Sequence, residues 1–232
     1  MKIGLLECDD VVGRFPEIRG GYREMFAALL PGFSFTYYEA HRGQLPSSPR
    51  ECDAWIATGS KYSVYEKHHW IDELAAFIRS TKSEKPFVGI CFGHQMLAHA
   101  MGGEVAKAKQ GWGVGVLGVE VLKKEPWMEP PLAFIQIQHM HQDQVQKLPA
   151  DSVRLGRSPH CDVAMFRVGE TMLGIEGHPE FTVEYGTALI RARRTQIGEQ
   201  GAQRALDSLK GKTDSPAVGR WIARFLGARR LG

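Results

Sequence analysis

The chain has 232 residues, of which 43% are apolar and 24% are charged. This is the composition of an ordinary globular protein, long enough to bury a core as one large domain or two small ones. The net charge of +3 is spread along the chain, and the basic runs at 191–194 and 228–230 are interpreted as solvated helix faces. Composition therefore argues against a nucleic-acid partner. No run of about 18 apolar residues is present, so no membrane span is expected.

The cysteines point to a reducing compartment. Cys8, Cys52, Cys91 and Cys161 form no C-x-x-C pair, which removes the usual zinc and thioredoxin-like spacings. Four cysteines in a chain of this length do not resemble a disulfide scaffold. The first residues, "MKIGLLECDD", turn acidic too early for a signal peptide. We therefore expect a cytoplasmic protein.

The first half of the chain alternates apolar runs with helical patterns. Strands are predicted at 2–7, 33–40, 53–59 and 86–90, and helices at 21–30, 70–80 and 92–103. Strands that alternate with helices favour an α/β fold with an open, mostly parallel sheet flanked by helices.

The second half changes character. Five short strands are predicted in close succession, at 113–122, 132–139, 152–158, 163–169 and 171–178, which indicates an antiparallel or mixed extension of the sheet. Two helices are predicted to close the chain, the last with Ser215 as N-cap and Pro216 at its first helical position. Without a repeat or linker, we expect a single domain over 1–232.

Cys91 lies in "GICFG", which has the spacing of a nucleophile elbow. The flanking glycines, Gly89 and Gly93, leave room for a sharp turn from strand to helix. Such a turn exposes the thiol at a helix N-terminus, where the free N–H groups favour the thiolate. The Phe92 backbone N–H would face a developing oxyanion. The other three cysteines are interpreted as buried structural residues.

A cysteine nucleophile that releases an amine needs a proton carrier. "GIEGHPE" places His178 at the end of a predicted strand and Glu180 two positions later. Residues i and i+2 of an extended segment face the same side, so Glu180 can orient the imidazole toward the sulfur. The alternative interpretation is a loop-end histidine beside a solvated glutamate.

Two further features complete the candidate site. The loop after the strand at 53–59 offers the backbone N–H of Gly59 or Ser60 as a second oxyanion donor. His94, three residues after the cysteine, is a weaker candidate base. His139 and His141 are spaced like a metal pair, but no third ligand motif accompanies them, so no metal site and no cofactor are expected.

Together these residues resemble the class I glutamine amidotransferases. "GICFGHQ" is similar to the family's G-x-C-x-G-x-Q, and "GIEGHPE" contains its closing H-P-E. "TGSKYSVYE" resembles its oxyanion-strand loop, and "HMHQDQV" resembles the H-x-D-x-V segment in the glutaminase domain of GMP synthetase. The four motifs occur in the family's order across about residues 53–182. The resemblance implies a flavodoxin-like class I amidotransferase fold.

The resemblance also implies the chemistry. Cys91 attacks the γ-carbonyl of glutamine, His178 protonates the leaving ammonia, and Glu180 orients His178. The oxyanion lies on N–H groups near Gly59 and Phe92.

Three polar residues follow from the same resemblance. Gln95 would help to hold the substrate amide, and Gln142 and Asp143 would contact the amino-acid end of the substrate. Two positions depart from the family's pattern: Gly-Ser-Lys replaces the usual Gly-Gly-Pro of the oxyanion loop, and Gln142 stands where glycine or serine is frequent.

Three functions are compatible with this pattern. The first is a stand-alone glutaminase of amidotransferase type. No P-loop or Ser-Gly-Gly ATP-pyrophosphatase motif occurs, so its ammonia would pass to a separate synthetase partner or to bulk water. The second is a γ-glutamyl peptidase that uses the same triad on γ-glutamyl conjugates. The third is a catalytically silent regulatory subunit, against which the intact triad counts.

Overall fold

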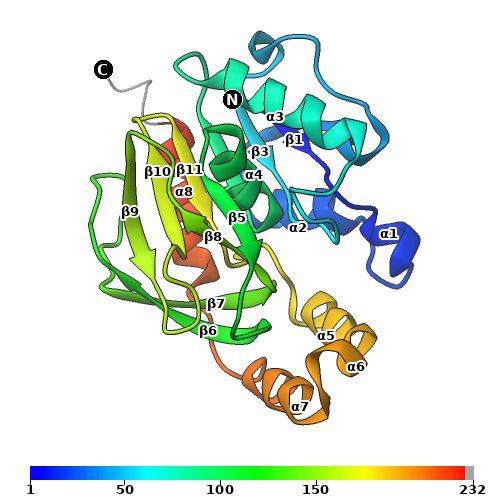
Figure 1. The fold of residues 1–232 in the computed structure, drawn as a ribbon. Helices are drawn as coiled ribbons and strands as arrows, with labels where there is room; N and C mark the ends of the chain where they lie inside the picture. The colour runs from blue at the N-terminus through cyan, green and yellow to red at the C-terminus, as the bar shows by residue number, and fades with distance from the viewer. Residues whose placement is uncertain (228–232) are drawn as a thin grey trace.

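A nine-stranded mixed sheet forms the centre of the computed structural model, which describes residues 1–227 (Figure 1). The basic run at 228–230 and the last residues of the expected domain lie outside the described residues. In the parallel half of the sheet the order is β2 (Ser34–Tyr38), β1 (Lys2–Leu6), β3 (Ala54–Ala57), β4 (Phe87–Ile90) and β11 (Met172–Ile175). The antiparallel half continues through β10 (Met165–Val168), β9 (Ser152–Arg157), β6 (Gly113–Val121) and β7 (Phe134–His141). The expected α/β sheet with an antiparallel extension is confirmed.

Helices cover both faces of the parallel half. Alternate side chains of β4 point to opposite faces, so Val88 and Ile90 join one buried cluster and Phe87 joins the other. The first cluster is closed by α2 (Gly21–Leu29) and α8 (Ser215–Gly227), and the second by α3 (His69–Thr81) and α4 (Phe92–Ala100). Because strands such as β4 are buried on both faces, nearly all of their residues are apolar, which explains the continuous apolar runs in the sequence.

The C-terminal region differs from the expected two helices. Residues 183–227 hold four helices, namely α5 (Val183–Ala192), α6 (Arg194–Ile197), α7 (Glu199–Ser208) and α8. Gly198, with φ +88°, lies between α6 and α7 and breaks what sequence spacing suggests is one helix. Ser215 is the first residue of α8 rather than its N-cap, and the Asp214 carbonyl accepts from the N–H groups of Ala217 and Val218.

Several short elements were not anticipated. β5 (Glu104–Lys107) and β8 (Asp143–Lys147) pair as a separate two-stranded sheet, and α1 (Val11–Arg14) follows β1. Two 3₁₀ turns, η1 (Ala40–Arg42) and η2 (Pro49–Glu51), lie between β2 and β3. Within residues 1–227, no helix combines the length and the apolar character that crossing a membrane requires.

Candidate active site

Cys91 occupies a strained turn between β4 and α4. Its φ and ψ of 51° and −103° lie outside the regions that a side chain favours. A Cβ on Gly89 would lie 2.2 Å from the Gly93 carbonyl oxygen, and a Cβ on Gly93 would lie 2.3 Å from the Ala57 carbonyl oxygen. The two glycines are therefore required because backbone approaches backbone at each of them.

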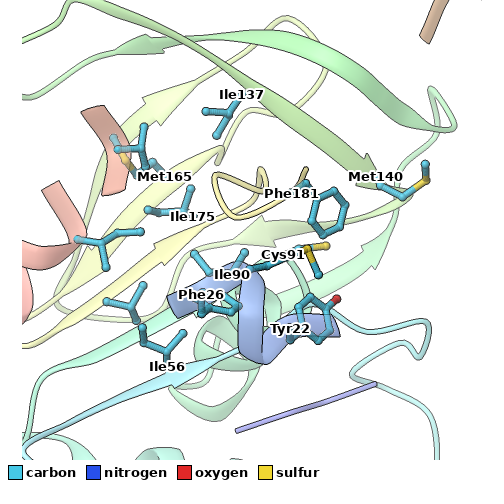
Figure 2. Close-up of a cluster of buried hydrophobic side chains, with 14 of the residues drawn as sticks. Tyr22, Phe26, Ile56, Ile90, Cys91, Ile137, Met140, Met165, Ile175 and Phe181 are labelled. Carbon is cyan, nitrogen blue, oxygen red and sulfur yellow. The ribbon is translucent and has the colours of Figure 1, made fainter. Parts of the chain in front are cut away.

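The thiol lies at the edge of a cavity of about 530 Å³. Cys91 is only 4% exposed, and Figure 2 shows its side chain between Tyr22 of α2 and Phe181. Phe92 and Ser60 line the same cavity. The sulfur is thus shielded on its apolar side and open toward a space of the size that small-molecule ligands occupy.

Burial controls the resting state of this thiol. It raises the pKa of Cys91 well above the usual value, and the negative charges of Glu176 and Glu180 raise it further. The charge of Arg193 and the hydrogen bond from the Phe92 N–H act in the opposite direction without overcoming burial. The helix N-terminus therefore acts in the expected direction through the Phe92 N–H, but burial outweighs it and favours the thiol in the ligand-free site.

His178 and Glu180 meet as their spacing predicts, although the backbone differs. β11 ends at Ile175, a bend follows at Glu176 and Gly177, and His178 then forms an isolated antiparallel bridge with Gln138, whereas Glu180 lies in a turn. His178 Nδ1 lies 2.8 Å from Glu180 Oε1, and the imidazole stacks on Phe181 with ring centroids 3.7 Å apart. Both residues are buried. The bond to Nδ1 leaves Nε2 as the nitrogen that can exchange a proton.

The oxyanion loop lies against this histidine. A Cβ on Gly59 would be 2.8 Å from His178 Cε1 and 2.9 Å from the Tyr22 hydroxyl, so only glycine fits there. Ser60 donates its hydroxyl to the Cys8 carbonyl at 2.7 Å, and the same hydroxyl accepts from the Tyr62 N–H. The structure therefore brings the Gly59–Ser60 segment beside His178.

The polar residues that were expected to hold the glutamyl end of the substrate lie together in the cavity. Gln95, Gln142 and Asp143 all line the cavity with Cys91. The Gln95 amide nitrogen donates to the Asp143 carbonyl at 2.9 Å and to Glu176 Oε1 at 2.7 Å. Both of its N–H groups are used, so Gln95 offers a substrate its oxygen only.

Three further buried histidines lie around Glu176. His94 Nε2 lies 3.0 Å from Glu176 Oε2, and His141 Nδ1 lies 3.2 Å from Glu176 Oε1. His139 Nδ1 lies 3.3 Å from His141 Nε2. Burial by itself would raise the pKa of Glu176, but its interactions with the His141 and His94 imidazoles bring it below its usual value. His94 is thus engaged with a carboxylate.

Sequence analysis did not identify two residues of the site. Glu176 lies inside the "GIEGHPE" motif, but only the fold shows that it is fully buried beneath α4. Arg193 belongs to the basic run 191–194 that was interpreted as a solvated face, and that interpretation is wrong for this residue because Arg193 lines the cavity. The "GIEGHPE" motif could have drawn attention to Glu176. The spacing of the basic run gave no indication that Arg193 turns toward the cavity.

The chain is similar to known proteins over most of its length. The family model of the class-I glutamine amidotransferases matches residues 38–194. Gamma-glutamyl peptidase 2 of Arabidopsis thaliana is 27% identical over 227 residues, which are 92% of this chain and 91% of that protein. The glutamine-hydrolyzing GMP synthase of Thermosipho melanesiensis is 33% identical over 141 residues, which are 59% of this chain and 26% of that protein.

A solved structure shows the same fold over nearly the whole chain. A glutamine amidotransferase from Thermotoga maritima superimposes with a TM-score of 0.76 and covers 99% of this chain and 97% of its own. The two sequences are 22% identical, so this likeness concerns the fold.

Proposed function

The chain belongs to the class I glutamine amidotransferase family, and on this premise we propose that it hydrolyses γ-glutamyl amides through a Cys91 thioester. The observation that carries the proposal is the 2.8 Å contact between His178 and Glu180, in the segment that follows β11, next to the strand that ends at the strained turn of Cys91. A nucleophile, a base and a group that orients the base are the parts of such a site.

The reaction follows from the protonated resting thiol. His178 Nε2 takes the Cys91 proton as the sulfur bonds to the γ-carbonyl carbon, and the carbonyl electron pair moves onto oxygen. The N–H groups of Phe92 and of the Gly59–Ser60 segment stabilise that oxyanion. When it collapses, the C–N bond breaks and the leaving nitrogen takes the proton from His178. Water, deprotonated by His178, then hydrolyses the thioester to release glutamate.

We favour γ-glutamyl peptides over free glutamine as substrates. The cavity of about 530 Å³ is in the range that binds whole small-molecule ligands, whereas glutamine has only ammonia as its leaving group. The similarity to gamma-glutamyl peptidase 2 also extends over nearly the full length of both proteins. The proposed substrates are γ-glutamyl conjugates of the glutathione type.

The second candidate is a glutaminase that supplies ammonia to a separate synthetase. The similarity to a glutamine-hydrolyzing GMP synthase, over 59% of this chain, favours it. Gln95, Gln142 and Asp143 would hold the glutamyl end in either reaction. We further propose one amidotransferase-like domain over 1–232 and a cytoplasmic location, which the four unpaired thiols fit.

Turnover of the purified chain tests the proposal. Glutamine and a panel of γ-glutamyl peptides are compared for glutamate release. We expect peptides to be cleaved with the higher kcat/KM, Cys91→Ala to abolish turnover, and His178→Ala to lower kcat by roughly 10²–10⁴. Cys52→Ala and the exposed His69→Ala serve as matched controls that keep activity. Full activity in Cys91→Ala would overturn the mechanism, and faster glutamine cleavage would select the second candidate.

A further inference from the structure

Arg193 turns inward from an otherwise exposed basic run. It caps the C-terminus of α5, where α6 begins. Arg191 is exposed, and Arg194 is bound to Glu199 on the outer surface. Arg193 instead lines the cavity that holds Cys91. Its guanidinium lies 5.3 Å from the ring centroid of Trp112, which also lines the cavity.

The charge of Arg193 is not neutralised by the protein. Within residues 1–227, no carboxylate pairs with its side chain, whereas its neighbour Arg14 is bound to Asp9 at 2.7 Å. Burial and the charge of Arg14 lower the pKa of Arg193, but an arginine stays charged at neutral pH. A half-buried guanidinium without a counter-ion is unfavourable, and an anionic ligand in the cavity would relieve this cost.

The position of Arg193 identifies which end of the substrate it faces. The leaving nitrogen must lie against His178, because His178 supplies its proton. Arg193, His178 and Ser60 all line a small hollow of about 10 Å³. The residues expected at the glutamyl end, Gln95, Gln142 and Asp143, line the main cavity, which Arg193 shares, but not this hollow. Arg193 therefore extends from the main cavity to the hollow beside His178, which is the side where the leaving nitrogen would lie.

We propose that Arg193 forms an anion subsite for the carboxylate of the leaving group. The substrate class is then γ-glutamyl amino acids or short γ-glutamyl peptides that keep a free C-terminal carboxylate near the scissile bond. The planar guanidinium can hold a carboxylate through two parallel hydrogen bonds. This inference rests on the proposed γ-glutamyl amide hydrolysis and adds the recognition of the amine that leaves.

Matched substrate pairs test the subsite. γ-Glutamylglycine is compared with γ-glutamylglycinamide, and glutathione with its C-terminal carboxamide. We expect wild-type kcat/KM to be about 10- to 100-fold higher for the carboxylate member of at least one pair, the size of one charge-assisted hydrogen bond. Arg193→Gln should remove that difference, and Arg193→Lys should keep part of it. Arg191→Gln, on the outer face of the same helix, should leave it unchanged.

Binding to Cys91→Ala separates the subsite from the chemistry. Calorimetry on this variant, with and without Arg193→Gln, measures the preference for carboxylate over carboxamide without turnover. Absence of turnover in the wild type together with an Arg193-dependent carboxylate preference would refute the hydrolysis but uphold the subsite. Equal binding of both members of each pair, or no binding of either, would overturn the subsite. So would an equal loss for both members in Arg193→Gln, because the residue would then hold the glutamyl α-carboxylate.

Discussion

Glu176 is the residue that links the nucleophile to the rest of the site. Its carboxylate is fully buried, and it receives a hydrogen bond from Gln95 at 2.7 Å. His94 of α4 and His141 of β7 approach the same carboxylate within 3.2 Å. The negative charge of Glu176 is the largest influence, after burial, that raises the pKa of the Cys91 thiol. The residue therefore sets both the orientation of Gln95 and the acidity of the nucleophile.

Glu176→Gln should make Cys91 more acidic. The substitution removes a buried negative charge that disfavours the thiolate, while the new side-chain carbonyl can still accept from Gln95. We expect the pH midpoint of Cys91 alkylation by iodoacetamide, followed by peptide mapping, to move to lower pH. At pH 8 the alkylation rate should rise, because a larger fraction of the thiol is then ionised. The exposed Glu184→Gln is the matched control, and an unshifted midpoint in Glu176→Gln would contradict the role.

Single site residues can be predicted from the sequence where a motif or a spacing of a few residues determines their position. Cys91, His178 and Glu180 were predicted from the paired glycines and the i, i+2 spacing, because both features act within a few residues. The role of Arg193 could not be predicted from the sequence, because the orientation of its side chain depends on where α5 ends relative to the cavity. The net acidity of the thiol could not be predicted for a related reason: helix position is readable in a sequence, whereas burial and distant carboxylates are not.

At the scale of elements, the turn from β4 to α4 requires glycine at positions 89 and 93, because another part of the backbone lies close to each of them. A Cβ on Gly89 would meet the Gly93 carbonyl oxygen at 2.2 Å, which a flexible side chain cannot absorb because the neighbour is backbone. Gly89→Ala should therefore lower the free energy of unfolding by at least about 1–3 kcal/mol, the cost of overpacking, and reduce kcat by shifting α4. Urea denaturation and turnover measure the two effects.

A helical glycine outside the site provides the comparison. A Cβ on Gly201 of α7 would meet the Ile197 Cγ2 methyl group at 3.2 Å, a side-chain rather than a backbone neighbour. That side chain can move, and alanine favours a helix, so Gly201→Ala should leave stability and kcat near wild type. If Gly89→Ala behaved like Gly201→Ala, the elbow would not need its glycine.

Elements were predicted where hydrophobic periodicity dominates. The strands of the parallel half and the helices α2, α3 and α4 match their patterns to within a few residues at each end. β5 and β8 were missed because they are short, largely polar strands that pair only with each other. The division of residues 183–208 into α5, α6 and α7 was also not predicted, because Gly198 interrupts a helical pattern that continues on both sides.

At the scale of the whole molecule, the sheet order assembles the site. β4 and β11 are parallel neighbours, with Ile90 paired to Ile175, so Cys91 and the segment that leads to His178 follow these strands at the same edge of the sheet. β7 fixes His178 by an isolated antiparallel bridge, in which the Gln138 carbonyl accepts from the His178 N–H at 2.7 Å. Sequence alone predicts the strands but not which of them are adjacent, because adjacency depends on long-range pairing.

Two buried histidines couple the stability of the whole fold to pH. His139 and His141 are both buried, and burial lowers the pKa of each below its usual value of 6.5, most strongly for His139. The folded state therefore holds them neutral at a pH where the unfolded chain binds protons. Stability is then fully present above about pH 6.5 and is lost as the pH falls, because protons favour the unfolded state.

Urea unfolding between pH 5 and 8 measures this linkage. A histidine that stays neutral when folded contributes a slope of up to about 1.4 kcal/mol per pH unit below its unfolded pKa, so the free energy of unfolding should fall as the pH drops below about 6.5 and level off above pH 7. Because burial lowers the pKa of His139 more strongly than that of His141, His139→Gln should remove the larger part of the slope. His69→Gln, whose side chain is 85% exposed, should not change it. A free energy of unfolding that is independent of pH between 5 and 6.5 would show that these imidazoles gain protons without unfolding the chain, and that the polar cluster around Glu176 accommodates their charge.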